Sequence, residues 1–281
     1  TENFSRFLPR RIKSLAIFGG VSINPQMMKL GGVEVLIATP GRLIDLVGRN
    51  SVGISRIHTL VIDEADKLLQ MGFREEMDHL LELTPKKKQT LLFSATQDQE
   101  LASLIQQLLK NPIEIQVAPT DFTPDSIHQE AYRVSAETKG PFLRQLIQSG
   151  DWKQILVFAS SIRTADNMVV KLNKNGINAV AFHGDKSQGA RTEALAKFKS
   201  GKTRVLVATD LAARGIDIQG LPLVINYELP RSPKDDIHRI GRTGRAGATG
   251  HAISLITPEE QHHFKVIQKK MGKWVTLVPA E

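Results

Sequence analysis

The sequence contains no cysteine, only two tryptophans and two tyrosines, and no apolar run long enough to span a bilayer. Without cysteine the chain has no disulfides or thiolate metal sites, which is compatible with the reducing cytoplasm. So few large aromatic side chains argue against a surface on which nucleic-acid bases stack in succession. The first residues are polar and lack the apolar segment of a signal peptide. We therefore expect a cytoplasmic protein without a membrane segment.

A second absence concerns nucleotide phosphates. The sequence has no Gly-x-x-x-x-Gly-Lys-Ser/Thr loop, the motif that cradles phosphates after a strand. The nearest match, Gly201-Lys202-Thr203, lacks the earlier glycine. It also follows an expected helix and precedes an expected strand, the reverse of the order that phosphate capture needs. We expect Gly201 to end a helix instead.

The length and composition fit one large or two ordinary domains, and the charge favours a polyanionic partner. The chain has 281 residues, of which 41% are hydrophobic, and its formal net charge is +8. Most of the excess positive charge lies in residues 119–281. Such an excess favours salt-sensitive binding to nucleic acid, although solubility alone explains it equally well.

The pattern of apolar residues predicts an α/β fold with mostly parallel sheets. Short β-branched runs alternate with helical stretches along the whole chain, as in sheets that helices cover on both faces. A segment rich in proline, threonine and aspartate at 119–126 predicts a linker between a first domain, 1–118, and a second, 127–281. The expected strands are Leu15–Phe18, Val33–Ala38, Thr59–Ile62, Thr90–Phe93, Ile113–Val117, Ile155–Phe158, Ala179–Phe182, Arg204–Ala208, Leu223–Asn226 and Ala252–Ile256.

Two adjacent carboxylates follow the expected strand Thr59–Ile62. Asp63 is suited to hold the Mg²⁺ of a nucleotide, Glu64 to orient the attacking water, and Asp66 continues the acidic edge. The alternative is a solvated turn or a helix N-terminus. The apolar residues Leu60–Ile62 directly before the two carboxylates favour the catalytic interpretation. The eight histidines show no metal-ligand spacing, so Asp63 is the metal ligand that we expect.

The segment His238–Arg245 is the most specific signature in the chain. It contains three arginines, one histidine and two glycines within eight residues. Arg242 and Arg245 are three residues apart and can reach the same developing phosphate charge. A solvated basic helix is the alternative, but glycines allow the backbone to approach a ligand closely, which favours a binding role.

Two weaker signatures depend on their context. Ser94 and Thr96 follow the strand Thr90–Phe93, where small hydroxyls commonly cap helices. Beside the carboxylates they would relay the state of the nucleotide. Asp217 follows a glycine in residues 213–217 and would accept a hydrogen bond from a ribose hydroxyl, although such a residue more often belongs to a turn.

Taken in order, these motifs resemble the DEAD-box RNA helicases. The resemblance rests on Thr-Pro-Gly-Arg at 39–42, Asp-Glu-Ala-Asp at 63–66, Ser-Ala-Thr at 94–96, Ala-Arg-Gly-Ile-Asp at 213–217 and the segment 238–245. Residues 18–26 resemble the bacterial RhlE-type subgroup. The resemblance covers essentially the whole chain. It implies two RecA-like lobes that close on ATP, Mg²⁺ and single-stranded or short duplex RNA.

The resemblance also implies roles for individual residues. In the first lobe Asp63 would contact Mg²⁺, Glu64 would be the general base, and Asp66 would complete their motif. Ser94 and Thr96 would couple hydrolysis to strand separation. In the second lobe His238 would lie near the γ-phosphate and link the lobes, and Arg242 and Arg245 would be arginine fingers. Gly215 and Asp217 would touch the nucleotide. The RNA backbone would meet Gly20, Thr39, Arg42, Gln188, Arg191 and Thr209.

The chain departs from the family pattern at its start. The adenine-reading Gln motif, the phosphate loop and a Pro-Thr-Arg-Glu-Leu-Ala segment are absent and are expected to precede residue 1, which makes the first lobe incomplete. The strands Thr90–Phe93 and Ile113–Val117 would then lack their shared neighbour and leave apolar surface uncovered. The second lobe is complete and should fold alone.

We therefore interpret the chain as part of an ATP-dependent RNA helicase that opens short duplexes or remodels ribonucleoprotein. By itself the chain should be inactive as an ATPase, because phosphate-loop contacts stabilise the transition state by several kcal/mol. A non-catalytic RNA-binding fragment and a truncated reading frame are the alternatives. The sequence does not choose between ribosomal and RNA-decay partners.

Overall fold

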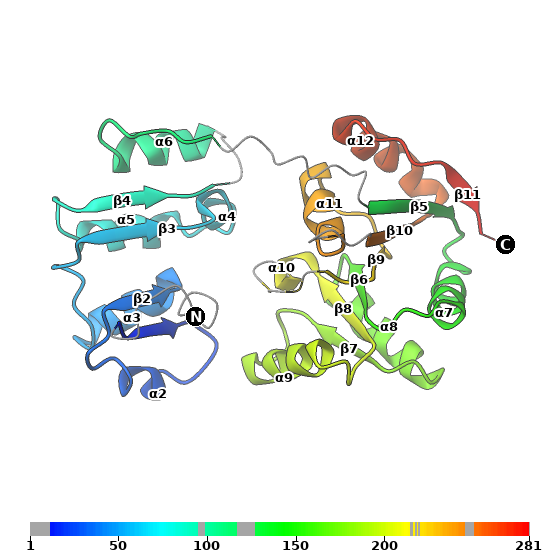
Figure 1. Cartoon of the computed structure of the whole chain (residues 1–281), viewed down its shortest axis with the longest axis horizontal. Helices are drawn as coiled ribbons and strands as arrows, with labels where there is room; N and C mark the ends of the chain where they lie inside the picture. Colours follow the sequence, from blue (N-terminus) through cyan, green and yellow to red (C-terminus); the bar gives the residue numbers. More distant parts are fainter. Residues whose placement is uncertain are drawn as a thin grey trace. The chain divides into compact units, whose positions relative to one another are not determined.

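The computed structural model describes residues 12–94, 99–116, 127–213, 216, 218, 220–244 and 250–280 (Figure 1). The chain divides into two compact units, Thr1–Gln116 (unit 1) and Val117–Glu281 (unit 2). The predicted linker at 119–126 lies outside the described residues. So do four predicted site residues, Thr96, Gly215, Asp217 and Arg245. Among the described residues, no helix combines the length and apolar character that crossing a membrane requires.

Unit 1 contains two separate pairs of parallel strands. Strand β1 (Ser14–Ile17) pairs with β2 (Val35–Ala38), and β3 (Thr59–Ile62) pairs with β4 (Gln89–Leu92). A small core lies between the second pair and its helices, built from Ile62, Ala65, Leu69, Met77, Leu101 and Leu104. The helices are α2 (Asn24–Met27), α3 (Pro40–Gly48), α4 (Ala65–Gln70), α5 (Arg74–Glu82) and α6 (Gln99–Leu108).

The predicted strand Ile113–Val117 is wrong over its described part, because residues 113–116 form no strand. Ile113 is 90% exposed and Ile115 is 81% exposed. An extended segment needs a hydrogen-bonded neighbour to become part of a sheet, and no described strand of unit 1 pairs with it. Val61 and Phe93, on and just after the paired strands, are also more than half exposed. The expectation of uncovered apolar surface in this unit is thus confirmed.

Unit 2 is built on a seven-stranded sheet in the order β11-β5-β10-β9-β6-β8-β7, and every pair in it is parallel. The central strands β6, β8 and β9 are buried along their whole length because helices cover both faces. The strands are β5 (Ile127–Arg133), β6 (Ile155–Ala159), β7 (Ala179–Phe182), β8 (Val205–Thr209), β9 (Leu223–Asn226), β10 (Gly250–Ile256) and β11 (Leu277–Pro279).

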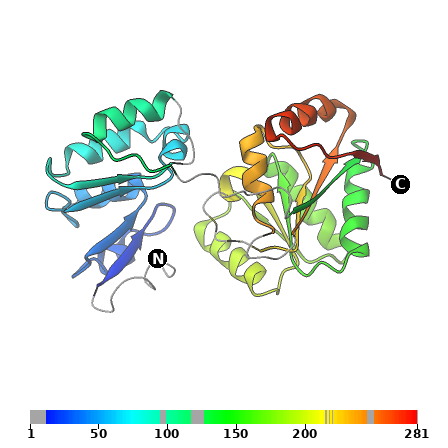
Figure 2. The same ribbon diagram turned by 45° about the horizontal axis from the view of Figure 1, so that its top comes forward.

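The helices of unit 2 lie on the two faces of this sheet (Figure 2). Helices α7 (Lys139–Ser149) and α8 (Ile162–Lys174) pack on one face. The other face carries α9 (Gln188–Lys199), α10 (Asp210–Ala213), α11 (Pro233–Ile240) and α12 (Gln261–Met271). The 3₁₀ turn η2 (Pro258–Glu260) directly precedes α12, and its Glu260 pairs with Lys139 at 2.8 Å. Gly201 has a φ of 75° just after α9, which confirms that it ends the helix.

Two strands of unit 2 escaped the sequence analysis. In β5 three polar residues stand in a row, His128, Gln129 and Glu130, so the segment has no apolar run. Strand β11 is three residues long and lies at the sheet edge, where one row of backbone groups stays unpaired. Both strands are set by pairing with a neighbour rather than by local pattern.

A buried polar network holds α11 against the sheet. The guanidinium of Arg239, which is 2% exposed, donates to both carboxylate oxygens of Asp210 at 2.5 and 2.6 Å. Its Nη1 donates to Asn226 Oδ1 at 3.0 Å and to the Glu228 carbonyl at 2.7 Å. Asn226 Nδ2 in turn donates to Asp236 Oδ1 at 2.8 Å. Two helix residues are thereby tied to the ends of two strands.

Burial sets the protonation behaviour of Asp236. Its carboxyl group is desolvated beneath α11, which raises its pKa to about 6, while the charge of Arg239 and the bond from Asn226 oppose that rise. An acid whose pKa is higher in the folded than in the unfolded state binds more protons when folded. Stability from this group is therefore greatest at low pH and falls as the pH rises towards 6.

Replacing Phe198 by alanine should destabilise unit 2 by about 3–5 kcal/mol, because its fully buried ring fills the core under α9. Both tryptophans, Trp152 and Trp274, belong to unit 2, so their fluorescence in denaturant follows this unit. Leu211→Ala is the control, since Leu211 is 59% exposed and should change stability by no more than about 0.5 kcal/mol. Equal losses for both variants would contradict this placement of the core.

Asp236→Asn should remove part of the pH dependence of unit 2. Between about pH 4 and pH 6 the wild type should lose stability relative to the variant as the pH rises, because the wild type must ionise a buried carboxyl group. Urea unfolding at several pH values, followed by tryptophan fluorescence, measures the difference. Parallel stability curves for the two proteins would show that Asp236 does not titrate in this range.

Candidate functional site

Polar residues follow neighbouring strands of unit 2 at the same edge of its sheet. Ser160 follows β6, His183 follows β7, Asp210 follows β8 and Glu228 lies just beyond β9. Because all these strands are parallel, their carboxyl ends share one edge, where open α/β sheets bind ligands. Ser160 donates to the Glu228 carboxylate through its amide at 2.6 Å and its hydroxyl at 2.7 Å. These two hydrogen bonds link the segments that follow β6 and β9.

The acidic cluster of unit 1 stands at the carboxyl end of β3. Asp63 and Glu64 are both exposed, and Glu64 has a φ of 52°, so the chain turns sharply before α4 begins. Asp63 Oδ1 accepts from the Glu64 amide at 2.9 Å, and Glu64 Oε1 accepts from Lys67 Nζ at 2.5 Å. Asp66 is 1% exposed. The first two acids therefore face solvent, where a cation can reach them, and the third is buried in the structure.

Strand β4 brings Ser94 to the same end of unit 1. The Phe93 amide donates to the Ile62 carbonyl at 2.8 Å, and the Phe93 carbonyl accepts from the Ala65 amide at 3.0 Å. These bonds fix the end of β4 beside the acidic turn. Ser94 is exposed there, next in sequence to Phe93.

The predicted RNA-contacting residues of unit 1 surround the loop after β1. Gly20 is exposed with a φ of 75°, and Thr39 is exposed at the start of α3. Arg42, which was also expected to meet the RNA backbone, is buried, and its Nη2 donates to the Val21 carbonyl at 2.7 Å. Gln26 accepts from the Phe18 amide at 2.9 Å and donates to the Phe18 carbonyl at 3.2 Å. Arg42 and Gln26 thus support the loop from beneath.

The arginine segment of unit 2 is joined to the loop after α10. Arg242 Nη1 donates to the Ile216 carbonyl at 2.8 Å, and the Arg242 carbonyl accepts from the Leu221 amide at 3.0 Å. The Thr243 hydroxyl donates to the Leu221 carbonyl. The structure therefore places Arg242 beside the segment 213–217 that was predicted to touch the nucleotide. His238 is half-buried on α11, one turn before Arg242.

The predicted RNA contacts of unit 2 gather near the start of α9. Gln188 is the first residue of this helix, and its side-chain oxygen accepts from Arg191 Nη2. The Arg191 guanidinium also lies 5.8 Å from the centroid of the Phe182 ring. Thr209 ends β8 and is buried. Of these residues, Gln188 and Arg191 retain partial exposure.

An ion-pair group at this edge joins α8 to the loop after β7. Asp166 accepts from Lys186 at 2.9 Å and contacts Nε2 of the buried His183 at 3.1 Å. Hydrogen bonding from Lys186 is the largest of the effects that lower the pKa of Asp166, and His183 adds to it. The carboxylate therefore stays ionised and holds the loop 183–186 in place.

Sequence reasoning missed the residues that position the site. Arg239 and Asp210 lie within or beside the recognised motifs, but nothing in a single sequence separates a buried arginine from one that faces a ligand. Gln26 was quoted only as part of a resemblance. Gln26 is the third residue of a four-residue helix, which is too short to show a periodic pattern.

Unit 1 therefore presents the exposed carboxylates of Asp63 and Glu64 after β3. In unit 2 the partly buried Arg242 donates to the Ile216 carbonyl. Oxygen donors such as the Asp63 carboxylate suit Mg²⁺, so the residues present fit this ion.

Two family models match the chain. A model of the DEAD/DEAH box helicases matches residues 1–104, and a model described as the helicase conserved C-terminal domain matches residues 138–247. The matched ranges contain the acidic cluster and the whole arginine segment, respectively.

Curated relatives are similar over nearly the whole chain. The ATP-dependent RNA helicase DbpA of Escherichia coli is 39% identical over 95% of this chain and 58% of its own length. The ATP-dependent RNA helicase RhlB of Pseudomonas syringae is 36% identical over 93% of this chain and 67% of its own length. The chain thus spans little more than half the length of several curated relatives that it matches.

Solved structures show the same fold. Saccharomyces cerevisiae Dbp5 bound to RNA and ADP BeF3 is 29% identical, with a TM-score of 0.82 over 96% of this chain and 71% of that one. A DEAD box protein from Methanococcus jannaschii is 34% identical, with a TM-score of 0.53 over 96% and 72%. The α/β fold with mostly parallel sheets is confirmed, and the chain belongs to the DEAD-box family of ATP-dependent RNA helicases.

Proposed function

We propose that this chain supplies both catalytic halves of an ATP-driven enzyme that opens short RNA duplexes or remodels RNA–protein complexes. The observation that carries the proposal is the placement of opposite charges on two sheet edges. Exposed Asp63 and Glu64 follow β3, and Arg242 donates to the carbonyl of Ile216, which comes after α10. Phosphoryl transfer needs a cation site and a base on one side and guanidinium groups on the other. The motif order supports RNA as the partner.

In this proposal Asp63 holds Mg²⁺, which neutralises charge on the nucleotide phosphates when bound, and Glu64 accepts a proton from the attacking water. Asp66 supports the acidic turn from within. Ser94 and Thr96 couple hydrolysis to strand separation, and His238, Arg242 and Arg245 stabilise the phosphate charge. Gly215 and Asp217 contact the nucleotide.

The RNA would be held along its backbone. Gly20 and Thr39 offer exposed backbone and hydroxyl groups in unit 1. Arg42 acts from beneath, because its hydrogen bond to Val21 shapes the loop that carries Gly20. In unit 2, Gln188 and Arg191 form the corresponding surface, and the buried Thr209 would support it from the end of β8. Contacts of this kind tolerate many sequences and distinguish RNA through its 2′-hydroxyls.

Within the family we place the chain in the RhlE-type subgroup, on the strength of residues 18–26. The named relatives include DbpA, CshA and RhlB proteins, so this finer assignment rests on the short loop motif alone. The loop is also where Gln26 makes its three hydrogen bonds to the backbone of Phe18 and Ser22.

ATP hydrolysis tests the catalytic part of the proposal. The 281-residue chain alone should show no RNA-stimulated hydrolysis near that of E. coli DbpA, because it has no phosphate loop. A chimera in which the preceding segment of DbpA is joined to residue 1 should hydrolyse ATP. There, Glu64→Gln should lower the rate at least about a hundredfold, since it removes the base.

Glu75→Gln is the matched control in this chimera, since Glu75 is an exposed acid on the neighbouring helix α5. Its rate should equal that of the unsubstituted chimera. If the folded chimera loses equally little activity with either substitution, Glu64 is not the base. Turnover by the 281-residue chain alone at the rate of DbpA would refute the need for a phosphate loop.

RNA binding separates the helicase from a non-catalytic RNA-binding fragment, which the basic charge of residues 119–281 favours as the second candidate. Arg191→Gln should weaken binding of a single-stranded RNA and reduce the slope of log affinity against log salt by about 1. Lys174→Gln is the control, because exposed Lys174 ends α8, at the opposite edge of the sheet. In the chimera, RNA affinity that changes with ATP favours the helicase, and affinity that is the same with and without ATP favours the non-catalytic fragment. If Arg191→Gln leaves the affinity unchanged, RNA does not bind at this surface in either case.

A further inference from the structure

We propose that unit 2 binds a divalent transition-metal ion, with zinc as the expected occupant, through His128, Glu130 and His251. Among the described residues these three side chains each offer a ligand atom, and the atoms lie within 4.8 Å of one another. The proposal concerns a site apart from the helicase motifs and does not depend on the proposed function.

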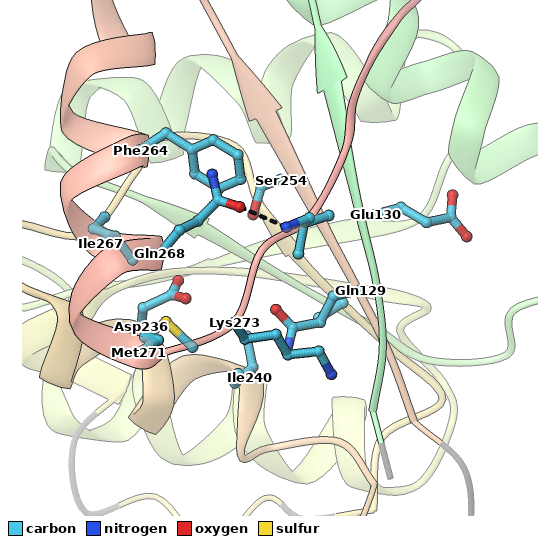
Figure 3. A pocket seen from close by; sticks show the side chains of 12 residues that line it. Gln129, Glu130, Asp236, Ile240, Ser254, Phe264, Ile267, Gln268, Met271 and Lys273 are labelled. Carbon is cyan, nitrogen blue, oxygen red and sulfur yellow. Dashed lines mark hydrogen bonds between the residues drawn. The ribbon is translucent and has the colours of Figure 1, made fainter. Parts of the chain in front are cut away.

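Strand register creates this cluster. His128 and Glu130 are two residues apart on β5 and therefore point to the same face of the sheet. His251 on β10 is the direct register partner of His128. Figure 3 shows Gln129 on the side of β5 that faces α12 and Glu130 on the opposite side. The three ligands thus share the face that α7 and α8 cover, on two adjacent hydrogen-bonded strands.

The distances are already near those of a coordination sphere. His128 Nε2 lies 3.0 Å from Glu130 Oε1, close to the separation of two ligand atoms that are each about 2.0–2.2 Å from a zinc ion. The ring centroids of His128 and His251 are 5.3 Å apart in an edge-to-face arrangement. A small side-chain rotation brings the third nitrogen within reach. Two imidazoles and one carboxylate suit zinc and leave one position for water.

Neighbouring side chains orient two of the ligands. The Tyr132 hydroxyl donates to Glu130 Oε2 at 2.5 Å, which leaves Oε1 turned to His128. The His251 ring packs on Trp152 with centroids 4.8 Å apart. Partners of this kind fix ligand orientation in metal sites.

The cluster is open to ions from solution and lies away from the nucleotide edge. The His128 side chain is 62% exposed and that of Glu130 is 34% exposed. His128 and His251 are each the second residue of their strand, so they lie near the amino ends of the parallel sheet. The helicase motifs follow the carboxyl ends. A bound ion would join the start of β5 to the start of β10 and stabilise unit 2 by mass action.

The proposal departs from the sequence analysis, which found no metal-ligand spacing among the histidines. Ligand spacing along the chain cannot reveal the pair, because His128 and His251 belong to strands far apart in sequence that become neighbours only in the sheet.

Calorimetric titration of the chain with zinc sulfate, after removal of metals, tests the proposal. The wild type should bind one ion, and its thermal unfolding, followed by tryptophan fluorescence, should shift to higher temperature. His128→Gln, Glu130→Gln and His251→Gln should each weaken binding at least about tenfold. His262→Gln is the control, because His262 is an exposed histidine on α12 outside the cluster.

His128→Gln is the decisive variant, since its exposed side chain can be replaced without disturbing the core; an unchanged fluorescence spectrum without zinc verifies the fold. The proposal is overturned if the wild type binds no zinc. It is equally overturned if the cluster variants bind as tightly as His262→Gln, which would assign the ion to other groups.

Discussion

The ion pair between Arg239 and Asp210 is the interaction on which the arrangement of unit 2 depends. Both carboxylate oxygens and three guanidinium nitrogens are engaged, and the arginine is almost fully buried above the Phe158 ring. A buried charge without partners costs several kcal/mol, so this arginine has essentially one acceptable position. Because Asp210 follows β8 and Arg239 belongs to α11, the pair fixes the arginine segment 238–245 relative to the carboxyl end of β8. Arg242 then reaches the carbonyl of Ile216.

Unit 1 also places its polar residues at the carboxyl ends of parallel strands, but on smaller sheets. Its acids are placed by the pairing of β3 with β4, and the bond from Ala65 to Phe93 fixes the turn. However, each of the two sheets in the described part of unit 1 has only two strands, and several apolar side chains remain exposed. Exposed apolar strands invite association, so this unit is where aggregation of the isolated chain would begin. The second unit, with seven strands and two covered faces, has no such weakness among its central strands.

Much of the fold was predictable because apolar runs report burial directly. The strands β6, β8 and β9 are buried at every position, and such runs are typical of central parallel strands. β5 was not predictable, because its own sequence has no apolar run. Pairing with β10 is what makes it a strand. The segment Ile113–Gln116 failed in the opposite sense: its residues favour a strand, but no neighbour in the described part of unit 1 pairs with it.

The sequence by itself determined the family, the order of the motifs and the residue types that stand after each strand, because these are properties of local pattern and spacing. The tertiary structure alone decided which polar residues face solvent and which support others. Arg42 and Arg239 are buried and hydrogen-bond to other parts of the protein, although in the sequence they look like arginines that bind a ligand. It also decided that His128 meets His251. The physical reason is that hydrogen bonding between strands, rather than distance along the chain, sets which side chains become neighbours.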